Sequence, residues 1–414
     1  MSPLAIVVSI VLIDLLGFSI VMPLLAPFAR EYGLSGVQIG LLFSAYPMCQ
    51  LIAGPILGRL SDRYGRRPLL VVSQAGTAVS FLILGLSTDF TVMLLARMLD
   101  GFSGGNILVA RAYVADVTPP EKRSRSMGLI GMAFGLGFVL GPLLCFLLLR
   151  VPVAPEWRLR LPFLVAAGFS TVAWLLVLFR LPESLPADVR ARQAARVVSW
   201  RGVLETVSRP MAGLLVAIGA LVVLGFAALE GTFSLFLHAR MGMGPERAAV
   251  AFVLLGLVSA VVQGGLMRRL VPRFGEPRLI VTGIATLIVG FVAMTFVANW
   301  PALLAATLVV GVGHGLASPT ISGLLSRTTP EGDQGAVFGT LSSAQTAARM
   351  INYSLANLLL ARVGSSAPYW EAAAVAAVAL LLSTRLLGRR DPTDVTLRPG
   401  ESEAMPAEVA SPGR

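Results

Sequence analysis

The chain has 414 residues, of which 56% are hydrophobic and only 13% charged, and its mean hydropathy is +0.80. Soluble domains carry about a quarter charged residues, so this composition excludes a soluble enzyme. The formal net charge of +11 does not indicate nucleic-acid binding, because the basic residues gather in short segments between long apolar runs.

The apolar runs, separated by Gly, Pro and Arg clusters, predict twelve membrane-spanning helices, because each run has about the length a span requires. We expect the first six at 4–27, 36–57, 68–86, 91–114, 126–149 and 161–179, and the second six at 210–238, 246–267, 279–298, 301–325, 336–360 and 368–387. The predicted fold class is an all-α membrane protein with twelve transmembrane helices in two six-helix halves. The corresponding domains are an N-terminal six-helix bundle over 1–179, a basic cytoplasmic linker over 180–209, a C-terminal six-helix bundle over 210–387 and a disordered cytoplasmic tail over 388–414.

Basic residues are distributed unequally between alternate loops. If the chain crosses the membrane twelve times, the segments on one side carry 23 Lys and Arg, whereas those on the other side carry 7. Basic loops remain in the cytoplasm. We therefore expect both termini there, in a multi-pass protein of the cell inner (plasma) membrane.

The two halves also repeat one another. A shift of 210 residues places Arg63 on Arg273 and Gly65 on Gly275, and further matches follow in the same register. Parallel duplication of six helices is one of the architectures of secondary transporters, with the substrate path between the repeats.

Residues 58–67 read Gly-Arg-Leu-Ser-Asp-Arg-Tyr-Gly-Arg-Arg. This segment resembles the signature loop of the major facilitator superfamily, G-x-L-x-D-R-x-G-R-R, which lies between helices 2 and 3. Residues 97–101 resemble the R-x-x-x-G motif of helix 4, and residues 112–125 resemble the drug:proton antiporter branch with twelve helices, especially its tetracycline-efflux-like members. Helix 5 resembles the antiporter motif at Gly137, Gly141 and Pro142, but Cys145 and Phe146 replace its closing pair of glycines.

The resemblance implies a gate at the signature loop. Asp62, Arg66 and Asp116 would form a charge relay that ties helices 2, 4 and 11 in the outward-open state. Gly58 and Gly65 are expected to allow tight turns. The alternative is that the loop arginines only keep this segment in the cytoplasm. The implied gating residues are Gly58, Asp62, Arg63, Gly65, Arg66, Arg67 and Asp116.

Charged residues within membrane spans are costly and indicate function by default. Arg97, Asp100 and Arg111 fall on one stripe of helix 4, and the first two are spaced to form an ion pair. They have either a purely structural role or a role in coupling and charge selection within a central cavity. The predicted set of proton-coupling or cavity charges is Asp14, Arg97, Asp100, Arg111, Glu230 and Arg349.

Two carboxyl groups are candidates for the proton carrier. Glu230 and Asp14 each lie in an apolar run, and Arg240 is the nearest basic residue in the chain to Glu230. Burial favours the neutral form of an isolated carboxyl, as proton binding and release require. The alternative for both is a neutral, hydrogen-bonded buried acid.

Helix 11 carries a polar stripe at spacings of three and four residues. Ser342, Gln345, Arg349 and Asn352 either face the substrate or join helices through hydrogen bonds. His314 has no metal-ligating partner at a suitable spacing, so we expect it to pack. We expect no metal site and no cofactor.

Taken with the resemblance, these features predict a secondary active transporter that performs proton-coupled efflux of a small amphiphilic compound or drug by alternating access. A proton-coupled symporter or facilitator for a metabolite is one alternative, and a transporter-like sensor that moves nothing is another. No nucleophile triad or phosphate loop indicates an enzyme. The expected partners are a small-molecule substrate, protons and the lipid bilayer, with no nucleic acid, and we expect a monomer.

Overall fold

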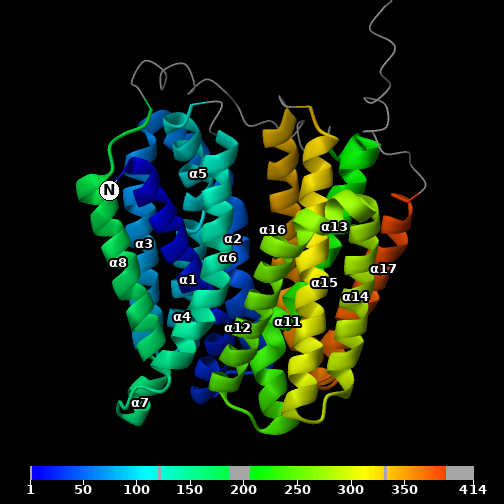
Figure 1. Cartoon of the computed structure of the whole chain (residues 1–414). Helices are drawn as coiled ribbons and strands as arrows, with labels where there is room; N and C mark the ends of the chain where they lie inside the picture. The colour runs from blue at the N-terminus through cyan, green and yellow to red at the C-terminus, as the bar shows by residue number, and fades with distance from the viewer. Residues whose placement is uncertain (1, 120–122, 186–205, 331–332, 388–414) are drawn as a thin grey trace, which may run out of the picture.

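The computed structural model describes residues 2–119, 123–185, 206–330 and 333–387, which form long helices lying side by side and no strands (Figure 1). The expected tail over 388–414 and most of the expected linker lie outside the described residues. The helices of the N-terminal half are α1 (Pro3–Glu31), α2 (Gly36–Tyr64), α3 (Arg66–Leu86), α4 (Phe90–Ser103), α5 (Asn106–Val117), α6 (Arg123–Leu148), the short α7 (Pro155–Arg158) and α8 (Leu161–Arg180). Those of the C-terminal half are α11 (Pro210–Met241), α12 (Pro245–Val261), α13 (Met267–Phe274), α14 (Glu276–Phe296), α15 (Trp300–Arg327), α16 (Gln334–Arg362) and α17 (Ala367–Thr384).

All twelve predicted spans are present, which confirms the all-α membrane fold. Among the described residues, 11 helical segments are long and apolar enough to cross a membrane. The twelfth is α16, which has 29 residues but a lower hydropathy because it carries the polar stripe of helix 11. It packs against α2 and α11 inside the bundle, where protein rather than lipid surrounds much of its surface.

Several helices extend beyond the predicted ends. Helix α2 continues to Tyr64, so Gly58 lies inside a helix and the tight turn expected there is wrong. The turn is at Gly65, whose φ of 105° favours glycine, and Gly275 occupies the matching place in the other half with a φ of 76°. Hydropathy marks only the part of a helix in hydrocarbon, so it misses polar turns that emerge at the membrane surface.

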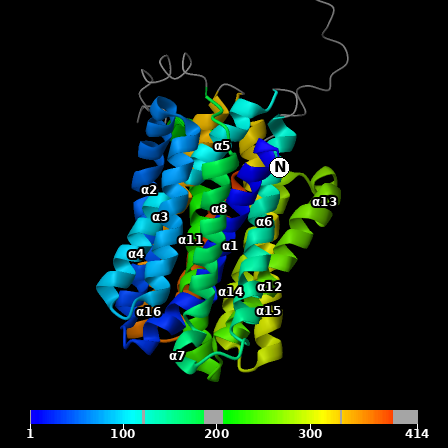
Figure 2. The same ribbon diagram turned by 90° about the vertical axis from the view of Figure 1, so that its left-hand side faces the viewer.

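Two spans are interrupted. Gly104 and Gly105 separate α4 from α5, so the fourth span is one segment of two helices. In the eighth span, a π-helical turn over Val262–Leu266 connects α12 to α13. Figure 2 shows α13 leaning away from α6 beyond this turn. A π-turn holds one more residue than an α-turn, and the local bend is its usual effect.

The two halves meet at one end of the bundle and separate towards the end that holds the N-terminus (Figure 1). At the closed end, the Ser44 hydroxyl donates to the Met350 carbonyl at 2.7 Å, and Ser234 donates to the Pro23 carbonyl at 2.8 Å. Arg158 and Glu246 form an ion pair between the halves at the same end.

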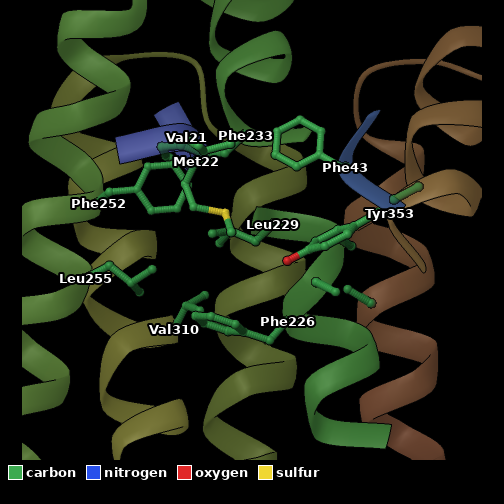
Figure 3. Close-up of a cluster of buried hydrophobic side chains, with 14 of the residues drawn as sticks. Val21, Met22, Phe43, Phe226, Leu229, Phe233, Phe252, Leu255, Val310 and Tyr353 are labelled. Carbon is green, nitrogen blue, oxygen red and sulfur yellow. The ribbon is translucent and has the colours of Figure 1, made fainter. Parts of the chain in front are cut away.

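Apolar side chains from both halves fill the closed end (Figure 3). They come from α1, α2, α11, α12, α15 and α16, and include Val21, Met22, Phe43, Phe226, Leu229, Phe233, Phe252, Leu255, Val310 and Tyr353. Several of them also form the wall of the central cavity.

Candidate functional site

A cavity of about 460 Å³ lies between the halves. Its walls come from α1 to α6 of the N-terminal half and from α11, α12, α15 and α16 of the C-terminal half, so neither half encloses it alone. This volume suits a drug-sized molecule. Among the described residues, the charged side chains that line it are Asp14, Asp100, Arg111, Glu230 and Arg349.

Asp14 is held by neutral amide donors. The Gln74 amide donates to both carboxylate oxygens at 2.9 Å, and the Asn106 amide donates to Oδ2 at 2.7 Å. No basic side chain of the described residues forms an ion pair with Asp14. Its carboxyl can therefore gain or lose a proton without breaking an internal ion pair.

Arg97 and Asp100 form an ion pair at 2.8 Å, as their spacing predicts. Arg97 is 2% exposed, and its Nε donates to the Leu42 carbonyl while its guanidinium lies 4.9 Å from the centre of the Tyr46 ring. The arginine lies behind the cavity wall, and Asp100 borders the cavity. The pair anchors the fourth span against α2.

Glu230 is not the isolated carboxyl that the sequence predicts. Arg349 Nε donates to Glu230 Oε2 at 3.1 Å, and the Tyr353 hydroxyl donates to the same oxygen at 2.8 Å. The prediction is wrong because the nearest basic residue in the chain is not the nearest in space. Helix α16 places Arg349, which is 119 residues away in the sequence, beside Glu230. Arg349 is therefore the counter-ion of Glu230.

The polar stripe predicted for the eleventh span lies on α16, and its residues have two different surroundings. Ser342, Gln345 and Arg349 line the cavity. Asn352 does not line it, which corrects its expected place in the substrate cavity, since its amide donates to the Leu224 carbonyl and to Glu371. Asn352 lies three residues after Arg349, nearly one helical turn, but its hydrogen bonds to α11 and α17 direct its side chain towards these helices.

His314 both packs and borders the cavity. Its ring stacks on Phe226 with the centroids 4.1 Å apart, and both residues are among those that line the cavity. No group of three or more His, Cys, Asp or Glu side chains in the described chain is arranged to hold a metal ion.

Arg111 reaches the cavity from α5. Its guanidinium lies 5.8 Å from the centre of the Phe134 ring, which also lines the cavity. The stripe predicted for a continuous helix 4 is broken at Gly104–Gly105, so Arg111 belongs to a separate helix from Arg97 and Asp100.

The signature segment forms a charge cluster within the N-terminal half. Arg66 contacts Asp62 at 2.5 Å and Asp116 at 3.1 Å, and its Nη1 also donates to the Ser61 hydroxyl at 2.6 Å. These ion pairs join α2, α3 and α5. The expected tie to the eleventh span, which is α16, is absent from the described contacts of these three charged residues.

Glu183 holds the start of α3, a role that sequence reasoning missed. Its carboxylate accepts from the backbone N–H of Arg66 at 2.8 Å and of Arg67 at 3.2 Å. Arg67 also donates through Nη2 to the Leu178 carbonyl at 2.7 Å, whereas Arg63 lies over the ring of Tyr64. Carboxylates stabilise helix N-termini, but this one arrives from 117 residues away.

The glycines of the antiporter motif pack α6 against α1. A Cβ on Gly137 would lie 2.5 Å from that of Leu15, and one on Gly141 would overlap the Ser19 hydroxyl. Ser19 donates to the Gly137 carbonyl at 2.7 Å, and Pro142 borders the cavity. The absence of side chains at these two glycines therefore allows α6 and α1 to lie in close contact.

Sequence reasoning also missed several neutral polar residues of the cavity. Gln74 and Asn106 hold Asp14, and Tyr353 holds Glu230. An amide in an apolar run was the available signal for the first two, and Asn106 directly follows the Gly104–Gly105 break.

Comparison with known proteins gives concordant matches. Residues 7–274 and 266–411 match the family model described as Major Facilitator Superfamily. The chain is 29% identical to the class B tetracycline resistance protein of Escherichia coli, over 87% of this chain and 88% of that protein. It is 28% identical to multidrug resistance protein 2 of Bacillus subtilis, over 86% and 88%. The crystal structure of the human organic anion transporter MFSD10 superposes with a TM-score of 0.67 and 26% identity, covering 92% of this chain and 98% of that one.

Proposed function

This chain belongs to the Major Facilitator Superfamily of transporters, and we propose that it exports small amphiphilic compounds, including drugs, in exchange for protons. The observation that carries the proposal is Asp14, a carboxyl that lines a drug-sized cavity between the halves and has no cationic partner among the described residues. The names of the tetracycline and multidrug resistance relatives support the same substrate class.

The direction of transport depends on orientation. We place both termini in the cytoplasm of a bacterial-type inner membrane, in agreement with the excess of basic residues on that side. The halves separate at this end (Figure 1), so the cavity receives its substrate from the cytoplasm. Alternating access then requires the bundles over 1–179 and 210–387, joined by the linker over 180–209, to rock until the opposite end opens.

The coupling follows from the cost of an uncompensated charge. In the open cavity, water solvates an ionised Asp14. When the empty cavity closes and water leaves, the ionised carboxylate loses this solvation without gaining a counter-ion, which is unfavourable. A proton on Asp14 removes this cost and so favours reorientation of the empty carrier. Glu230 already has Arg349 as its counter-ion, so its charge is no obstacle to closure.

A gradient experiment tests this function. Everted membrane vesicles that contain the protein should accumulate fluorescent amphiphilic drugs when the lumen is acidic, and a protonophore should abolish the accumulation. Vesicles without the protein control for passive partition. Accumulation that ignores the pH gradient would contradict proton coupling, and concentrative uptake of a metabolite by intact cells would favour the symporter instead.

A further inference from the structure

Arg111 differs from the other charged side chains of the cavity. Asp100 has Arg97, Glu230 has Arg349, and Asp14 has two amide donors. Among the described residues, Arg111 has no hydrogen-bond or ion-pair partner, and its side chain is exposed to the cavity. It is thus a cation within a membrane span, Phe90–Val117, that no described acidic side chain compensates.

Asp14 and Arg111 form a complementary set. Neither has an oppositely charged partner in the part of the chain that the structure describes, and both line the cavity from the same half. Asn106, which holds Asp14, precedes Arg111 by five residues on α5, equivalent to roughly 7 Å of helical rise. The two charges are therefore offset along the cavity wall and remain separate.

The wall around these charges is aromatic. Phe134 lies beneath the Arg111 guanidinium, and Phe18 contacts both Phe138 at 6.0 Å and Tyr46 at 5.4 Å between ring centroids. All four rings line the cavity. Such a wall favours a flat apolar body, whereas the guanidinium offers paired donors that suit a carboxylate or another oxyanion.

We propose that this cavity selects amphiphilic zwitterions, with Arg111 binding the anionic group and Asp14 the cationic group at the two ends of an aromatic body. The proposal rests on the proposed function, because it assigns the substrate class of the same cavity. It also agrees with exchange, since an ammonium group on Asp14 excludes the proton from that carboxylate. When the cavity closes, the ligand supplies the counter-charges that the protein lacks.

A series of ligands with one shared body tests the assignment. Norfloxacin carries an ammonium and a carboxylate at opposite ends of an aromatic ring system, its methyl ester is only a cation, and N-acetylnorfloxacin is only an anion. Equilibrium dialysis against the full chain in lipid nanodiscs measures each affinity without any gradient. We expect norfloxacin to bind at least about tenfold more tightly than either derivative, as one charge-assisted contact would give.

Substitutions then assign each charge to its partner. Arg111→Gln should remove the preference for norfloxacin over its ester, and Asp14→Asn should remove the preference over N-acetylnorfloxacin. Arg111→Lys should keep most of the first preference. Arg150→Gln is the matched control, because Arg150 also lies over a phenylalanine, Phe146, but does not line the cavity.

Three results would overturn the proposal: no binding of norfloxacin by the unaltered protein, equal binding of norfloxacin and its ester, or an equal loss of all three ligands in Arg111→Gln. The proposed function fails separately. If the zwitterion binds as expected but no drug is accumulated against its gradient, export is wrong and the ligand class stands. If simple cations are exported in response to the gradient but norfloxacin does not bind, the ligand class is wrong and export stands.

Discussion

A single substitution tests whether Asp14 carries the proton. Asp14→Asn keeps the size of the side chain and leaves a permanently neutral group beside Gln74 and Asn106. We expect the accumulation of drug in everted vesicles to become equal with and without an imposed pH gradient, because the carboxyl proposed to bind and release the proton has been removed. The control is Glu31→Gln, which removes an exposed carboxyl from the end of the same helix and should preserve gradient-driven accumulation.

Should Asp14→Asn still concentrate drug in response to the gradient, Asp14 is not the carrier. The same measurement on Glu230→Gln would then decide whether Glu230 carries the proton although it forms an ion pair with Arg349. In that variant we expect lowered stability, because Arg349 loses its counter-ion.

The Arg97–Asp100 pair is a structural anchor whose two members depend on each other. Removing either one leaves the other charge buried without its partner. Arg97→Met and Asp100→Ala should therefore each lower the free energy of unfolding by more than half of the loss in the double variant. We expect a coupling energy of about 1–3 kcal/mol from a double-mutant cycle on unfolding in detergent.

An exposed ion pair provides the comparison for that cycle. Arg209 and Asp333 form an ion pair at 2.7 Å, but their side chains are 44% and 45% exposed. Their coupling should stay below about 1 kcal/mol, as for other surface pairs. Additive effects at Arg97 and Asp100 would show that the buried contact contributes nothing beyond its separate residues.

Helix existence was predictable, and helix ends were not. Hydropathy located all twelve spans, including the polar α16, because a strip of apolar residues remains on each. The polar final turns of α2 and nearly all of α13 were assigned to loops, since their charges lie at the membrane surface where the helix continues. The breaks at Gly104–Gly105 and at the π-turn were missed because a glycine pair inside a span permits an interruption without requiring one.

The signature segment contains two glycines with opposite requirements. Gly65 has a φ of 105°, and a Cβ there would lie 2.3 Å from the Glu183 carboxylate, so Gly65→Ala should destabilise the protein by about 1–3 kcal/mol. Gly58 lies inside α2 with open space beside it, so Gly58→Ala should be neutral or stabilise by up to about 1 kcal/mol. Thermal unfolding in detergent measures both.

Equal destabilisation by the two substitutions would show that the segment does not fold as described. Glu183→Ala separates the two causes at Gly65. If the contact with Glu183 dominates, Gly65→Ala should cost less in the Glu183→Ala background, whereas a purely backbone origin would leave its cost unchanged.

At the scale of the whole molecule, the charges of the site could be read from the sequence, but their partners could not. A charge inside an apolar run is visible in a window of twenty residues. The partner of Glu230 lies on another helix of the same half, and the groups that hold Asp14 come from α3 and α5. Only the packing of the bundle places them together, so the isolated Glu230 was predicted wrongly and the mutual pair Arg97–Asp100, three residues apart, was predicted well.

The opposite conformer can be inferred from the register of the helices that join the halves. Helices α6 and α12 run antiparallel, and Gly256 already lies against the Phe138 carbonyl, 3.0 Å from where a Cβ would stand. Gly131 lies seven residues before Phe138, and Gly264 lies eight residues after Gly256, where the π-turn contributes the additional residue. Neither glycine has an atom within 4 Å of its missing Cβ, so these positions are free to meet when the open end closes.

Cysteine pairs can detect that closure. In a background with Cys49→Ala and Cys145→Ala, the pair Gly131→Cys and Gly264→Cys should cross-link only when drug and a pH gradient drive turnover, and the cross-link should stop transport. The pair Gly40→Cys and Ser354→Cys lies at the closed end, where a Cβ on Gly40 would be 3.1 Å from the Ser354 Cα, and should cross-link in the resting protein. Rocking of the halves makes the two cross-links mutually exclusive in one molecule. Formation of both bonds in the same chain, measured by mass spectrometry after proteolysis, would contradict alternating access about the central cavity.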